Sequence, residues 1–161
     1  MIYRITIVLI SLLGFQFTVL SQKQDTVSYI KQDTQPIEII LFENIFKYYL
    51  LTGDNLKVIT KKHTKGQGSV IFKADLNEKE SEIFRLNFQD LEELYENKCI
   101  FDGNQFIIQI KYIDKIKTIQ FRNFYLKEAD IIIQLINQKV PKQHMIWYDK
   151  TELIQELKDC N

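Results

Sequence analysis

The chain has 161 residues, with 21 Lys and Arg against 21 Asp and Glu, so its formal net charge is zero. A neutral chain lacks the concentrated positive surface that nucleic acid binding requires, and we therefore expect no nucleic acid partner. Removal of the N-terminal segment described next would leave 161 − 21 = 140 residues, which suits one domain with its own core.

Residues 1–21 have the three parts of a secretory signal peptide. Arg4 supplies the positive charge, the run from Ile5 to Leu20 contains no charged residue, and Ser21 closes a small-residue cleavage site before Gln22. Spanning a bilayer takes about 20 apolar residues, so this run favours cleavage over a retained membrane anchor. We expect an exported protein, periplasmic or extracellular and of bacterial type, that has no membrane attachment after cleavage.

Residues 22–36 are mostly polar and predict a flexible lead-in that ends at Pro36. Residues 37–161 are then expected to form a single domain. Three antiparallel strands are predicted at its start, over residues 37–51, 56–62 and 70–75, because these runs are rich in β-branched and aromatic residues. Turn-forming residues separate the three runs.

The middle of the chain predicts a strand over residues 83–86 and then a helix over residues 87–96. Asn87 is in place to cap this helix, and four apolar residues recur at three- and four-residue steps: Phe88, Leu91, Leu94 and Tyr95. An extended segment over residues 99–101 follows. Alternating apolar residues predict two more strands over residues 106–113 and 116–124, joined by a turn.

The C-terminal part predicts helices. Residues 128–139 have a helical apolar period that ends before Pro141, since the residue preceding a proline avoids the helical region. A short strand over residues 145–148 and a final helix capped by Asp149 complete the chain. We therefore expect an α+β fold: an antiparallel meander sheet of about five to six strands, with two to three helices packed on one face.

Cys99 and Cys160 are the two cysteines of the chain. In an oxidising compartment an even count favours a disulfide, which would fix the last helix to the domain. The alternatives are two separate buried thiols, or Cys99 as a nucleophile, which would need a histidine base. Closing a loop of 160 − 99 = 61 residues is worth about 4 kcal/mol in the loop-entropy model.

Catalytic and metal-binding patterns are absent from the sequence. The two histidines, His63 and His144, do not form a metal-binding spacing, and neighbouring acids such as Glu92 and Glu93 point to different sides of a helix. No phosphate loop, dinucleotide motif or nucleophile elbow occurs. We therefore expect no catalytic residue, no metal and no cofactor.

Aromatic residues gather in two regions and are the candidates for contacts with a partner: Phe42, Phe46, Tyr48, Tyr49, Trp147 and Tyr148. The first predicted strand is apolar on both faces, so it is either covered on both sides or meets a partner. The leading hypothesis is a non-catalytic, exported protein-binding module of inhibitor or immunity type. The alternatives are a small secreted hydrolase with an unrecognised active site, or a periplasmic protein that binds a small ligand. The oligomeric state is not predicted.

Overall fold

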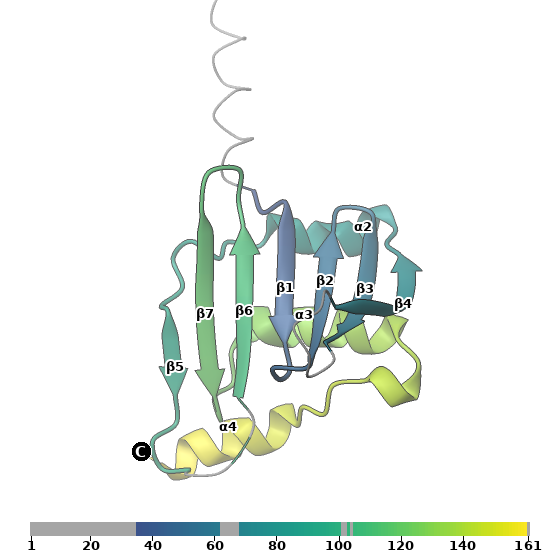
Figure 1. The fold of residues 1–161 in the computed structure, drawn as a ribbon. Helices are drawn as coiled ribbons and strands as arrows, with labels where there is room; N and C mark the ends of the chain where they lie inside the picture. The colour runs from purple at the N-terminus through teal and green to yellow at the C-terminus, as the bar shows by residue number, and fades with distance from the viewer. Residues whose placement is uncertain (1–34, 62–67, 101–102, 104, 161) are drawn as a thin grey trace, which may run out of the picture. The chain divides into compact units, whose positions relative to one another are not determined.

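The computed structural model describes residues 35–61, 68–100, 103 and 105–160 (Figure 1). The predicted signal peptide and nearly all of the polar lead-in lie outside these residues. From Pro36 onward the described residues belong to one compact unit, Pro36–Asn161. Within the described ranges, no helix combines the length and hydrophobicity needed to cross a membrane.

In these ranges, seven strands form one sheet with the order β4-β3-β2-β1-β6-β7-β5 (Figure 1). The neighbours pair antiparallel except β5 and β7, which pair parallel. The strands are β1 (Glu38–Phe42), β2 (Lys47–Thr52), β3 (Asn55–Thr60), β4 (Ser69–Asp75), β5 (Leu94–Glu96), β6 (Gln105–Lys111) and β7 (Ile116–Arg122).

The helices follow the strands in two groups. A short helix α2 (Glu78–Ser81) and a 3₁₀ turn η1 (Glu82–Arg85) come after β4. Helix α3 (Lys127–Lys139), a second 3₁₀ turn η2 (Lys142–His144) and helix α4 (Lys150–Asp159) come after β7. In Figure 1, α3 lies behind the sheet and α4 runs along its lower end.

The core lies between α3 and one face of the sheet. Side chains alternate between the two faces of a strand, and on β6 this places Phe106, Ile108 and Ile110 in the core, as the sequence predicts. Ala129 and Ile132 on α3 are fully buried and belong to the same cluster. We call the side of the sheet that faces α3 the core face.

The α+β class is confirmed, but the sheet is larger than predicted and is mixed. One extra strand arises because the run over residues 37–51 is a hairpin, β1 and β2, and not one strand. Its turn contains neither Gly nor Pro. Instead, the Oδ1 atom of Asn44 accepts hydrogen bonds from the backbone N–H groups of Phe46 and Lys47, at 2.8 and 2.9 Å, which is a side-chain route to a turn.

The predicted helix over residues 87–96 is wrong. The Asn87 side chain donates a hydrogen bond to the Asp90 carboxylate and caps no helix. Phe88 is buried, and it lies in an irregular segment. The chain then forms β5, whose Leu94 is opposite Gln120 on β7 in parallel register. The sheet is mixed because this edge strand pairs parallel with β7, whereas all other neighbours pair antiparallel.

Three other short predictions change, and two helices are confirmed. Residues 83–86 lie largely in η1, residues 145–148 form no strand, and the described residues at 99 and 100 are in a turn and a coil. Helix α3 begins one residue earlier than predicted. Helix α4 is capped by Asp149, whose side chain accepts hydrogen bonds from the N–H groups of Thr151 and Glu152.

Candidate functional site

The face of the sheet opposite α3 is the main candidate for function. On β1, Ile39 and Leu41 are fully buried on the core face, whereas Ile40 and Phe42 point to the opposite side and are half-buried. No helix of the described ranges covers this side, which faces the viewer in Figure 1. We call it the open face.

An apolar row crosses the open face from β4 to β6. Residues paired in register across antiparallel strands point to the same face, and the pairs here connect five strands through one line of side chains: Val70, Ile59, Tyr48, Phe42 and Ile107. Ile59 is itself buried, with Gly68 close to its side chain, and the strand register shifts between Val58 and Ile59. The rings of Phe42 and Tyr48 lie 5.4 Å apart between centroids. A second row beside it pairs Leu50 with Ile40 at its centre.

A hollow of about 410 Å³ opens beside Phe42 and Ile107, at the β6 end of this apolar row. Its walls come from the turn between β1 and β2 and from the start of β6: Phe42, Glu43, Asn44, Ile45, Gln105 and Ile107. Ile45 is 77% exposed although it is a large aliphatic residue. The hollow thus combines the apolar side chains of Phe42, Ile45 and Ile107 with polar groups of Glu43, Asn44 and Gln105.

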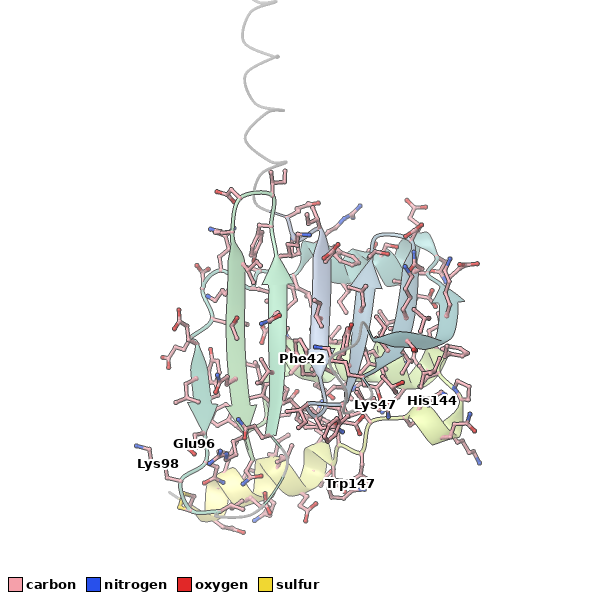
Figure 2. The ribbon with its side chains drawn as sticks, in the orientation of Figure 1. Phe42, Lys47, Glu96, Lys98, His144 and Trp147 are labelled. Carbon is pink, nitrogen blue, oxygen red and sulfur yellow. A yellow bond between two sulfur atoms is a disulfide. The ribbon has the colours of Figure 1, made fainter. Side chains whose placement is uncertain are left out.

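The six aromatic residues that the sequence singles out separate into different places. Phe42 and Tyr48 lie together on the open face, and Phe46 lies in the turn below them. Tyr49 is fully buried on the core face, so it is not available to a partner. Figure 2 places Phe42 at the lower end of β1 and Trp147 beyond the lower edge of the sheet. Trp147 is 68% exposed, and the Tyr148 ring packs on the Phe106 ring.

Tyr49 joins the core face to the segment that follows α3. Its hydroxyl donates to the backbone oxygen of His144 at 2.6 Å and to the Glu43 carboxylate at 3.1 Å. The Lys47 ammonium forms an ion pair with Glu43 at 2.9 Å, and Figure 2 shows Lys47 and His144 at this end of the sheet. Burial, and then the negative charge of Glu43, raise the pKa of Tyr49. The hydroxyl therefore stays protonated and acts as a donor.

A second polar cluster fastens α4 to α3. The buried Asp130 carboxylate accepts hydrogen bonds from Gln134 at 2.9 Å and from Lys150 at 3.0 Å, and the Tyr125 hydroxyl lies at 3.4 Å. The hydrogen bond to Asp130 raises the pKa of Lys150, so its positive charge is held. A buried carboxylate with this many partners is satisfied, and its arrangement is structural.

The predicted disulfide between Cys99 and Cys160 is present, with 5.7 Å between the two Cα atoms. It connects the turn after β5 to the end of α4, as predicted. Leu153 is the buried residue of α4, so the disulfide supplies much of what holds this helix in place. Because the bond leaves no thiolate at Cys99, the cysteine-nucleophile alternative is excluded.

Neither histidine forms part of a chemical site in the described residues. His63 lies outside them. The ring of His144 lies 6.3 Å from the Phe72 ring and 3.5 Å from the amide of Gln143. In the part of the chain that the structure describes, no group of three His, Cys, Asp or Glu side chains is close enough to hold a metal ion.

The candidate residues named from the sequence do not include the aliphatic and basic members of the open face, which are Ile40, Leu50, Lys57, Lys73 and Ile107. A signal for them was available, because strict alternation along β1 and β6 assigns Ile40 and Ile107 to the face opposite the core. The same alternation continues on β2, where Tyr49 and Leu51 lie on the core face and Leu50 on the open face.

Comparisons with protein-family models, with curated proteins and with solved structures find no significant match to this chain. The function is therefore inferred from the open face and from the chemistry of its residues.

Proposed function

We propose that this protein is an exported protein-binding module, of inhibitor or immunity type, and that the open face of its sheet is the contact surface. The observation that supports the proposal is the apolar row from Val70 to Ile107, whose members other than the buried Ile59 are half-buried or exposed on a side without a described helix. Contiguous apolar surface with a polar border is typical of protein interaction sites.

The composition of the face favours a protein over a small molecule as the occupant. Ile40 and Leu50 lie beside Phe42 and Tyr48, so aliphatic and aromatic groups form one broad surface with polar residues around it. Small ligands bind in concave sites that enclose most of their surface. The hollow beside Phe42 and Ile107 is open, and it suits one apolar side chain of a larger partner as an anchor.

Export is the other half of the proposal. The disulfide between Cys99 and Cys160 is consistent with an oxidising compartment, and the N-terminal residues have the pattern of a signal peptide. An exported module of this kind would meet its partner outside the cytoplasm. N-terminal sequencing of the protein recovered from the cell envelope or the medium tests this part, and a start at Gln22 is the expected result.

The binding surface is tested by replacing its centre while keeping strand propensity. In Ile40→Thr/Leu50→Thr, two β-branched residues retain the sheet and remove apolar contact area. A partner captured from the cell envelope by the wild-type protein should bind this variant at least about tenfold more weakly, since each buried aliphatic side chain contributes about 1.5–3 kcal/mol.

The matched control is Ile131→Thr/Met145→Thr, which removes two exposed apolar side chains outside the sheet, on α3 and after η2, that are 37% and 44% exposed. This variant should bind like the wild type. Thermal unfolding of both variants shows whether the fold is intact. Equal affinity of the wild type and the Ile40→Thr/Leu50→Thr variant would rule out the open face as the contact surface.

A further inference from the structure

We infer that the partner of the open face is an acidic protein surface, whose carboxylates lie over β3 and β4 and whose apolar side chains lie over β1 and β2. This inference rests on the proposed function and specifies its occupant. The observation behind it is a basic cluster, defined as Lys57, Lys61 and Lys73, at one side of the apolar rows.

Lys57 and Lys73 are direct partners in the register of β3 and β4. Each lies between residues of the core face, so both point to the open face; Lys57 is half-buried and Lys73 exposed. Like charges directly opposite each other on neighbouring strands destabilise a sheet. Such a pair is therefore a cost to the fold that an external acidic group would offset.

The third lysine adds charge on the same side. The Nζ atom of Lys61 lies 5.5 Å from the centre of the Tyr48 ring, which belongs to the apolar row. The ion pairs among the described residues include none of the three lysines. Lys73 does lower the pKa of Asp54 in the β2–β3 turn, as a minor cause behind the hydrogen bond from Thr52.

Elsewhere on the open face, two basic side chains of the described strands are paired with acidic ones. The ammonium of Lys111 pairs with Glu38 at 3.4 Å, and the guanidinium of Arg122 pairs with Glu96 at 3.3 Å. Since the whole chain has a formal net charge of zero, the basic cluster is a local asymmetry and not a reflection of composition. Charge complementarity then selects a partner with acidic groups at this position.

The register of the four strands β4, β3, β2 and β1 determines which side chains lie next to Lys57 and Lys73. The row that contains Lys73 and Lys57 continues through Leu50 and Ile40. An acidic partner would thus place carboxylates and apolar side chains side by side along a single row. A second copy stacked face to face would bring its own lysines to the same face.

The test uses a random peptide library displayed on phage, selected on the mature, disulfide-bonded protein at low salt. Selected peptides should be rich in Asp and Glu next to Leu, Ile or Phe. Lys57→Glu/Lys73→Glu should weaken the binding of the best peptide at least tenfold, and high salt should remove most of this difference because it screens the charges. Lys127→Glu/Lys142→Glu changes the charge equally on exposed residues away from the open face and should bind like the wild type.

The outcomes separate this inference from the proposed function. Peptides that lose binding in Ile40→Thr/Leu50→Thr but are not acidic, and bind Lys57→Glu/Lys73→Glu unchanged, would overturn the acidic partner and leave the contact surface standing. Peptides that bind all variants alike would overturn both. Two further outcomes would overturn the inference. If a fluorescent oligothymidine binds and Lys57→Glu/Lys73→Glu abolishes this binding, the occupant is nucleic acid. If the protein dimerises with rising concentration and Ile40→Thr/Leu50→Thr abolishes this, the occupant is a second copy.

Discussion

The hydroxyl of Tyr49 donates a hydrogen bond of 2.6 Å to the backbone oxygen of His144, across 95 positions of the chain. Tyr49 is in the second strand and fully buried, and His144 ends the turn that follows α3. This bond therefore connects the sheet to the segment between α3 and α4. Alternation along β2 places Tyr49 on the core face, where this bond is made, and its neighbour Tyr48 on the open face.

Replacement of Tyr49 by Phe should lower the free energy of unfolding by about 1 kcal/mol, because the carbonyl of His144 loses its shortest hydrogen bond in a part-buried position. Urea unfolding followed by circular dichroism measures the change. Tyr48→Phe is the matched control, since the Tyr48 hydroxyl has no hydrogen bond to another described residue and its loss should change stability by less than about 0.5 kcal/mol. Equal effects of the two substitutions would contradict this role of Tyr49.

Gly68 is needed where the chain enters β4. A Cβ atom at this position would lie 2.6 Å from Cγ2 of Ile59, a branched methyl group that cannot rotate away freely. Gly68→Ala should therefore destabilise the protein by about 1–3 kcal/mol through overpacking. At Gly53 a Cβ atom meets nothing within 4 Å, so Gly53→Ala should be neutral or stabilising by up to about 1 kcal/mol. The reverse order in thermal unfolding would contradict the close contact at Ile59.

Removal of the disulfide should weaken the fold substantially. Cys99→Ser/Cys160→Ser is expected to lose about 4 kcal/mol of stability, because the unfolded chain regains the freedom of a loop that spans 61 positions. Reductant should produce the same loss in the wild type. In the double variant reductant should change nothing, which is the internal control. Unchanged stability on reduction would mean that Cys99 and Cys160 do not constrain the chain.

High pH should unfold the protein through its buried tyrosines. Burial raises the pKa of Tyr49, Tyr112 and Tyr148 above the ordinary value of 10.0. The folded state thus binds the phenolic protons more tightly than the unfolded state, and this contribution to stability is complete below pH 10 and is lost as the pH rises further. Titration with phenolate absorbance and circular dichroism together should show these tyrosines ionising only as the fold is lost. Complete ionisation in a protein with a native circular dichroism spectrum would contradict their burial.

Local patterns predicted the parts of the fold that depend on local chemistry. Helix α4 begins where Asp149 can cap it, α3 follows its apolar period, and β6 places alternate residues in the core. The disulfide was predictable because the chain has only two cysteines and a pattern typical of export. Each of these features is decided within a short segment or by elimination.

The predictions failed where contacts between segments far apart in the sequence determine the local structure. The apolar spacing of Phe88, Leu91 and Leu94 fits a helix, but Phe88 fills the core from an irregular segment, and Leu94 remains 55% exposed on an edge strand. The parallel pairing of β5 with β7 joins segments that are separated in the chain by β6. The hairpin of β1 and β2 was missed because the turn at Asn44 is made by one side chain and has no Gly or Pro signal.

The most direct test of the open face as the contact surface is cross-saturation NMR on isoleucine methyl groups, with the selected partner bound. Ile40 and Ile107 point to the open face, whereas Ile39 and Ile108 are their fully buried neighbours on the same strands, and Ile131 is 37% exposed on α3. Saturating the protons of the partner should reduce the methyl signals of Ile40 and Ile107 and leave those of Ile39, Ile108 and Ile131 unchanged. A loss confined to Ile131, with Ile40 and Ile107 unaffected, would contradict the account.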